Sequence, residues 1–89
     1  MSIERWKTFS KHDQLLNIGS AIKRASNWQK QDPQKFSMAV DEALALLGLT
    51  LEDPKWTEYR FALEYLRSQI EKFKHGERKE NIEILYRAL

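Results

Sequence analysis

The residues of this chain that are able to do chemistry are few and widely spaced. The two histidines, His12 and His75, stand 63 positions apart, and there is no cysteine. Neither histidine has a second ligand at the spacing that a metal site needs. Asp41 and Glu42 are adjacent on an expected helix, where neighbours point about 100° apart, so they do not converge on one proton or one metal. We therefore expect no catalytic centre, no metal and no cofactor.

Arg5 and His12, with six residues between them, are the one pair that suggests a reaction. Their spacing resembles the loose Arg-x(4–6)-His pattern of the HEPN ribonucleases, which are also helical bundles. The resemblance implies an arginine near the scissile phosphate and a histidine that handles protons. That family carries its motif late in the bundle, whereas this pair lies at or before the first long helix. An RNA-binding or RNA-cleaving protein that uses Arg5 and His12 is the alternative hypothesis.

The positive charge of the chain is concentrated toward its N-terminus. Residues 1–38 hold seven basic and three acidic side chains, within a formal net charge of +2 for the whole chain. Trp6 and Trp28 lie in the same stretch, and cations combined with aromatic rings are typical of nucleic-acid surfaces. A solvated helix face with Trp28 in the core accounts for the same residues. Nucleic acid is therefore a possible partner that the charge pattern does not require.

The helix boundaries are marked by capping residues. Asp32-Pro33 and Asp53-Pro54 each place an N-cap acceptor before a proline at the first helical position. Gly48 and Gly76 each follow an apolar or basic run and suit left-handed C-caps, with His75 as a cation near the second cap. Ser10 or Asp13 caps the first long helix. The sequence predicts an all-α fold, a small four-helix bundle with helices at about 10–30, 33–47, 54–75 and 78–88.

Apolar residues at spacings of three and four mark the faces that pack together. The chain is short enough to form one domain, residues 1–89, in which residues 1–9 are an N-terminal lead-in. Gly19 lies on the apolar side of the first long helix, so a neighbouring element is expected to approach it closely. The predicted core consists of Leu15, Ile18, Ile22, Phe36, Val40, Ala43, Leu47, Trp56, Tyr59, Leu63, Leu66, Ile70 and Phe73.

A second set of apolar residues lies outside these stripes. Phe61 and Tyr65 point roughly opposite to the stripe of the third helix, so either that helix is buried on two sides or an aromatic patch faces outward. Tyr86 and Leu89 form an apolar end on a short terminal helix. We expect these four residues to be an interaction surface, used for pairing with a second copy or with another small protein. The favoured hypothesis is thus a non-enzymatic interaction or self-associating module, and specifically a homodimer.

Two stretches carry a resemblance to a known family. They are Ile18-Gly19-Ser20-Ala21-Ile22-Lys23-Arg24-Ala25-Ser26-Asn27-Trp28 and residues 41–56, DEALALLGLTLEDPKW. Together they resemble a family of small prokaryotic all-helical proteins with the patterns IGSxIxRAxNW and ERALELLDLTIADP. The match covers roughly residues 14–75 and departs at Gly48, where the pattern has Asp, and in a shorter C-terminal tail. The resemblance implies a helical fold and a prokaryotic source, and it implies no activity.

Composition excludes several classes of protein. Hydrophobic residues make up 42% and charged residues 31% of the chain, a balance typical of folded domains. The chain has no apolar run long enough to span a membrane, and its charged start does not fit a signal peptide. The lack of cysteine fits a reducing compartment. We expect a soluble, cytoplasmic protein without a membrane partner.

Overall fold

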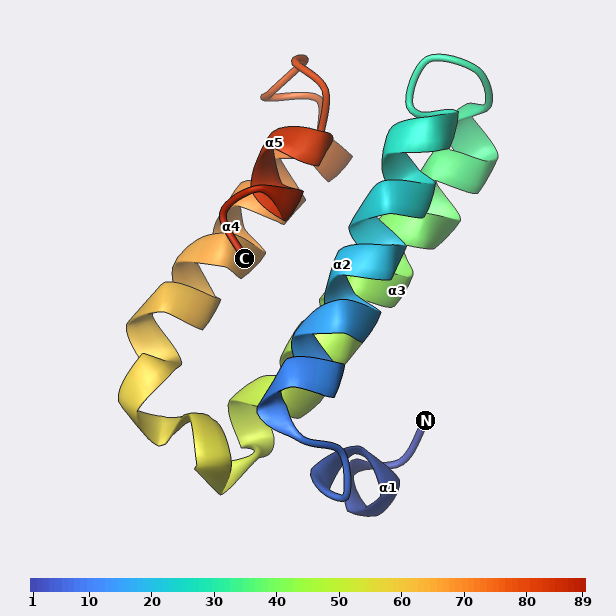
Figure 1. Cartoon of the computed structure of the whole chain (residues 1–89). Helices are drawn as coiled ribbons and strands as arrows, with labels where there is room; N and C mark the ends of the chain where they lie inside the picture. The colour runs from blue at the N-terminus through green and yellow to red at the C-terminus, as the bar shows by residue number, and fades with distance from the viewer.

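A computed structural model describes all 89 residues, and the fold is all-helical, without strands. Three helices of 15 to 20 residues form the body, and α2 and α4 both pack against the central α3 (Figure 1). The predicted all-α class is confirmed. In chain order the elements are α1 (Ile3–Lys7), α2 (Lys11–Trp28), α3 (Pro33–Glu52), the 3₁₀ helix η1 (Pro54–Tyr59), α4 (Arg60–Lys74) and α5 (Glu83–Tyr86).

The expected caps form where the side chains allow them. The Ser10 hydroxyl accepts from the Asp13 N–H at 3.1 Å and starts α2. The carboxylate of Asp32 accepts from two backbone N–H groups at the start of α3. At the end of α4, Gly76 has a φ of +76°, and the Glu77 N–H donates to the Lys72 carbonyl at 2.8 Å. This left-handed C-cap is the predicted one.

The prediction that a helix ends at Gly48 was wrong. The helix α3 runs through this glycine to Glu52, and Gly48 does not have a positive φ. The physical reason is the apolar face that follows: Thr50 is fully buried, and Leu49 and Leu51 pack against the core. Continued burial outweighs the cost of about 1 kcal/mol for a glycine inside a helix.

Gly48 therefore offers a substitution that should stabilise the fold. A Cβ added at Gly48 meets no atom within 4 Å. Replacing it with alanine should raise the free energy of unfolding by about 0.5–1 kcal/mol, because alanine loses less backbone entropy in a helix. Urea denaturation followed by circular dichroism measures the change. Gly76→Ala is the matched control and should lower the free energy of unfolding, because its φ is positive. A destabilised Gly48→Ala protein would contradict the continuous α3.

Two other expected helices differ from the structure. The range 54–75 is helical, but residues 54–59 form a 3₁₀ helix, in which residues three apart eclipse. This geometry brings the rings of Trp56 and Tyr59 edge to face, with centroids 5.6 Å apart. Within the range 78–88 only the four residues of α5 are helical, and the backbone before them is bound by the side chain of the residue that caps the end of α2. Gln29 accepts from the Ile82 N–H and donates to the Glu80 carbonyl.

The core matches most of the predicted set and adds residues to it. Leu63 and Leu66 are buried, as expected, whereas Leu15 and Phe36 are only partly buried. Tyr59 was wrongly placed in the core, since 47% of it is exposed. The expected close approach to Gly19 occurs, but the neighbours are the side chains of Tyr86 and Leu89 from the C-terminal segment. Buried apolar residues outside the predicted set are Trp6, Ala21, Ala25, Ala39, Leu46, Ile82 and Leu85.

The lead-in of the expected domain, residues 1–9, contains a short helix that packs into the core. It contains α1, which begins after the N-cap Ser2 and places Trp6 fully inside the core. The Trp6 indole N–H donates to the Thr50 hydroxyl at 3.0 Å, and that hydroxyl donates to the Leu46 carbonyl at 2.7 Å. A buried indole nitrogen needs such a partner. The short α1 is therefore tied to α3 by both packing and a hydrogen bond.

A buried polar network lies next to Trp6. The fully buried amide of Gln14 donates to the Trp6 carbonyl at 2.8 Å and to the Asp53 carboxylate at 3.0 Å, and it accepts from the Trp56 indole at 2.7 Å. Burial alone would raise the pKa of Asp53. The hydrogen bonds from Gln14 and Lys55, together with the charge of Lys55, outweigh burial and hold that pKa below its usual value. The network joins α1, α2, α3 and η1.

Candidate functional site

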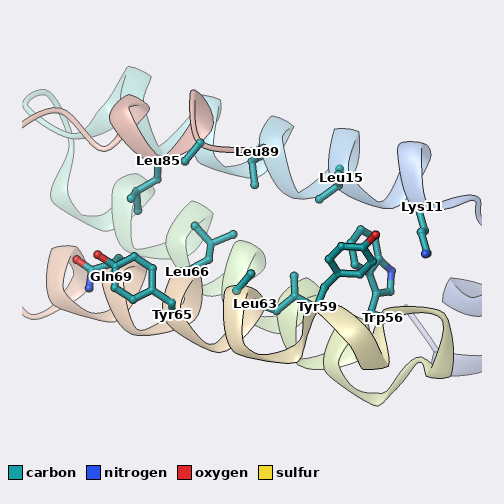
Figure 2. A pocket seen from close by; sticks show the side chains of 12 residues that line it. Lys11, Leu15, Trp56, Tyr59, Leu63, Tyr65, Leu66, Gln69, Leu85 and Leu89 are labelled. Atoms are coloured by element: carbon teal, nitrogen blue, oxygen red, sulfur yellow. The ribbon is translucent and has the colours of Figure 1, made fainter.

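An apolar groove of about 550 Å³ runs between α2 and the η1–α4 unit (Figure 2). Its only polar lining residues are Lys11 and Gln69, and the other ten are apolar or aromatic. Grooves of this volume and composition are typical of sites that bind apolar ligands or side chains. The lining consists of Lys11, Leu15, Trp56, Tyr59, Ala62, Leu63, Tyr65, Leu66, Gln69, Leu85, Ala88 and Leu89.

The groove exists because of the way the helices pack. The main neighbours of α2 are α3 and α5, while α4 packs on α3 and η1. The short C-terminal segment lies between α2 and α4, and its Leu85 and Leu89 line only one end of the groove. The other end lies between Leu15 of α2 and Tyr59 of η1. A bundle of four long helices would have its fourth helix between α2 and α4. Here only the short C-terminal segment with the four-residue α5 lies there, so part of this fourth helix position is open.

The floor and the rim of the groove differ in exposure. Leu63 and Leu66 of α4 form a buried floor, with 5% and 8% of each residue exposed. Tyr59 and Tyr65 form the rim on the side of α4, and they are 47% and 68% exposed. Tyrosine, with an apolar ring and a polar hydroxyl, is enriched at protein interfaces. The groove therefore runs from a buried apolar floor to half-exposed and exposed tyrosine rings on its rim.

Lys11 gives the open end of the groove a positive charge. Its ammonium lies 5.6 Å from the centroid of the Trp56 ring and 5.0 Å from that of Tyr59, so both rings hold it by cation–π attraction. Lys11 makes none of the salt bridges within the chain. An occupant with a carboxylate near this end would gain an ion pair there.

The structure places the four expected surface residues in two settings. Phe61 is 90% exposed and Tyr65 is 68% exposed, so the aromatic pair faces outward and α4 is not buried on two sides. Tyr86 and Leu89 are each 38% exposed and pack on Gly19, with the Lys23 ammonium 4.9 Å from the Tyr86 ring centroid. Tyr65 and Leu89 both line the groove, whereas Phe61 and Tyr86 do not.

The residues of the alternative hypothesis are not assembled into a site. Arg5 in α1 and His12 in α2 are both exposed, no side-chain hydrogen bond or salt bridge joins them, and neither lines the groove. Asp41 forms a salt bridge with Lys74 at 2.6 Å, and Glu42 forms a separate one with Arg24 at 2.7 Å. No group of three or more His, Asp or Glu side chains is placed to hold a metal. No helix is both long enough and apolar enough to cross a membrane.

Sequence reasoning missed most of the groove wall. Trp56, Leu63 and Leu66 were expected in a closed core, and Lys11 and Ala62 were not singled out. A signal for the wall does exist, since Tyr59, Ala62, Leu66 and Gln69 follow one another at spacings of three and four. That row is offset from the row that faces α3. Periodicity marks such a row as a second face but does not show whether another helix covers it.

The chain matches no protein-family model, and comparison with curated proteins and with solved structures finds no match. The family resemblance of residues 14–75 therefore stays a prediction.

Proposed function

We propose that this protein is a non-enzymatic interaction module that binds an amphipathic helix of a partner protein in the groove between α2 and α4. The observation that carries the proposal is the groove itself, about 550 Å³ with ten apolar or aromatic residues among the twelve that line it. A helix laid into such a groove uses apolar residues at positions i, i+3, i+4 and i+7 as anchors. It would take the open part of the fourth helix position beside α2 and α4.

The charge at the groove end specifies the partner further. Lys11 is the only charged residue in the lining, and it makes no salt bridge within the chain. An Asp or Glu next to the apolar face of the partner helix would pair with it. The partner is therefore an amphipathic helix with an acidic residue at one end of its apolar stripe. Salt should weaken this ion pair and leave the apolar contacts in place.

A selection experiment tests the proposal. A phage-displayed library of amphipathic peptides of about 18 residues, long enough for roughly 27 Å of helix, is panned against the immobilised protein. We expect enriched peptides to share apolar residues at helical spacing and an acidic residue near one end. Ala62→Arg should weaken their binding at least about tenfold, equivalent to about 1.4 kcal/mol, because the arginine fills the groove. Fluorescence anisotropy of a labelled enriched peptide measures the affinity.

The control is the same substitution on another helix. Ala45 is an exposed alanine of α3 that does not line the groove, so Ala45→Arg should leave peptide binding unchanged. Circular dichroism verifies that both variants stay helical. Enriched peptides without a helical apolar pattern, or binding that both arginine variants weaken equally, would exclude the groove as the site. RNA binding through Arg5 and His12 stays the alternative hypothesis.

A further inference from the structure

The end of the groove near Leu85 holds a buried amide whose orientation is fixed. Gln69 of α4 is 8% exposed and lines the groove at this end, while Lys11 lies at the opposite end (Figure 2). The Gln69 Oε1 accepts a hydrogen bond from the Arg78 guanidinium at 2.8 Å. An arginine side chain has only donors, so the amide cannot be turned around without losing this bond. The NH2 group of Gln69 therefore lies on the side away from Arg78.

Arg78 is itself held from two sides. Its Nε donates to the Glu80 carboxylate at 2.9 Å, and its guanidinium carbon lies 4.7 Å from the centroid of the Phe73 ring. The ion pair and the cation–π contact both limit the movement of the guanidinium. Gln69 is thus oriented by a neighbour that has its own fixed partners.

The NH2 group of Gln69 has no acceptor within the chain. Its Nε2 makes no hydrogen bond, and no enclosed side-chain nitrogen or oxygen lacks a partner, so Nε2 is accessible. Because the residue is otherwise buried and lines the groove, this accessible donor is open to the groove. An occupant that covers the donor without supplying an acceptor removes its hydrogen bond with water and gives nothing in return. A well-matched occupant therefore brings an acceptor to this end.

We infer that Gln69 is a specificity-determining residue of the groove, and that its NH2 group donates a hydrogen bond to a side-chain acceptor of the bound helix. The inference rests on the proposed function and adds a second polar anchor to the acidic residue that pairs with Lys11. Lys11 lies against Tyr59, just before α4, and the α4 backbone from Arg60 to Gln69 is about 14 Å long. The partner helix thus carries two acceptors about three turns apart, with apolar residues between them.

Panning the same peptide library against the wild type and against Gln69→Glu tests the inference. The glutamate keeps an oxygen for Arg78 and replaces the NH2 donor with a second acceptor. We expect peptides selected on the wild type to carry Asp, Glu, Asn, Gln, Ser or Thr about three turns from the acidic residue that pairs with Lys11. Peptides selected on Gln69→Glu should carry Lys or Arg there. Peptides from the wild-type selection should bind Gln69→Glu about tenfold more weakly in fluorescence anisotropy, because two acceptors then face each other.

A second measurement needs no variant of the protein. Replacing the acceptor residue of a selected peptide with an apolar residue of similar shape should weaken its binding to the wild type about fivefold, because the Gln69 donor is then covered and unpaired. The same replaced peptide should lose no affinity for Gln69→Glu. Equal losses on both proteins would overturn the inference, since they would show that the peptide residue acts without Gln69.

The control is the same substitution at another glutamine. Gln34 is exposed on α3 and does not line the groove, so Gln34→Glu should leave both the selected peptides and their affinity unchanged. Circular dichroism verifies that both variants stay helical. Apolar residues at the expected acceptor position of the wild-type peptides, or the same residue on both proteins, would overturn the inference. If those peptides still bind in an Ala62-dependent way, the proposed function stands and only the role of Gln69 is removed.

Discussion

Replacing Trp6 with alanine is expected to lower the free energy of unfolding by about 3–5 kcal/mol, the usual cost of truncating a buried tryptophan. Trp6 is fully buried although it belongs to a helix of five residues, and its ring also meets Phe9 edge to face at 5.7 Å. A domain of this length has a total stability of about 4–13 kcal/mol, so the substitution removes a large share of it. Guanidinium denaturation followed by far-ultraviolet circular dichroism gives the loss.

Trp28 supplies the matched control for this prediction. It is a half-buried tryptophan whose ring holds the Lys35 ammonium at 4.2 Å, and it lies at the end of α2 and away from the network around Gln14. Trp28→Ala should lower the free energy of unfolding by clearly less than Trp6→Ala does. Equal losses in the two variants, or a Trp6→Ala protein as stable as the wild type, would mean that α1 does not form part of the core.

The features that could be predicted from the sequence are those decided by neighbouring residues. The caps at Ser10, Asp32 and Gly76 depend on side chains and backbone angles within one turn, so their residue types reveal them. The same local reasoning failed at Gly48, because the continuation of α3 depends on what its next turn packs against. Thr50 is buried through its bond with Trp6, which lies 44 residues earlier in the chain. Such a partner leaves no local pattern.

The groove, like the end of α3, could be predicted from the sequence only in part. The exposed aromatic pair could be identified, since Phe61 and Tyr65 lie off the main stripe of their helix. The groove itself could not be predicted, because Leu63 and Leu66 have the spacing of core residues whether or not a fourth helix covers them. Only the packing shows that α5 is four residues long and reaches one end of the space. The number and length of the covering helices therefore decide whether an apolar row is core or groove.

Replacing Gln14 with leucine is expected to cost about 2–4 kcal/mol of folding free energy, although leucine is apolar and the site is fully buried. The substitution leaves the Trp56 indole N–H without its acceptor and removes one donor to the Asp53 carboxylate. An orphaned buried polar group costs about 1–3 kcal/mol, more when a charge is involved. The control is Gln34→Leu, at an exposed glutamine whose side chain makes no hydrogen bond, with an expected change within about 0.5 kcal/mol.

A double-mutant cycle separates the network from simple packing. Trp56→Phe removes the indole donor, so Gln14→Leu should cost less in that background, with a coupling of about 1–2 kcal/mol. Additive losses would show that the Gln14–Trp56 bond does not contribute. The cycle also bears on the groove, because Trp56 forms its wall beside Lys11 and its indole is held in place by Gln14. We therefore expect Gln14→Leu to weaken binding of the selected helical peptides under conditions where the protein is still folded.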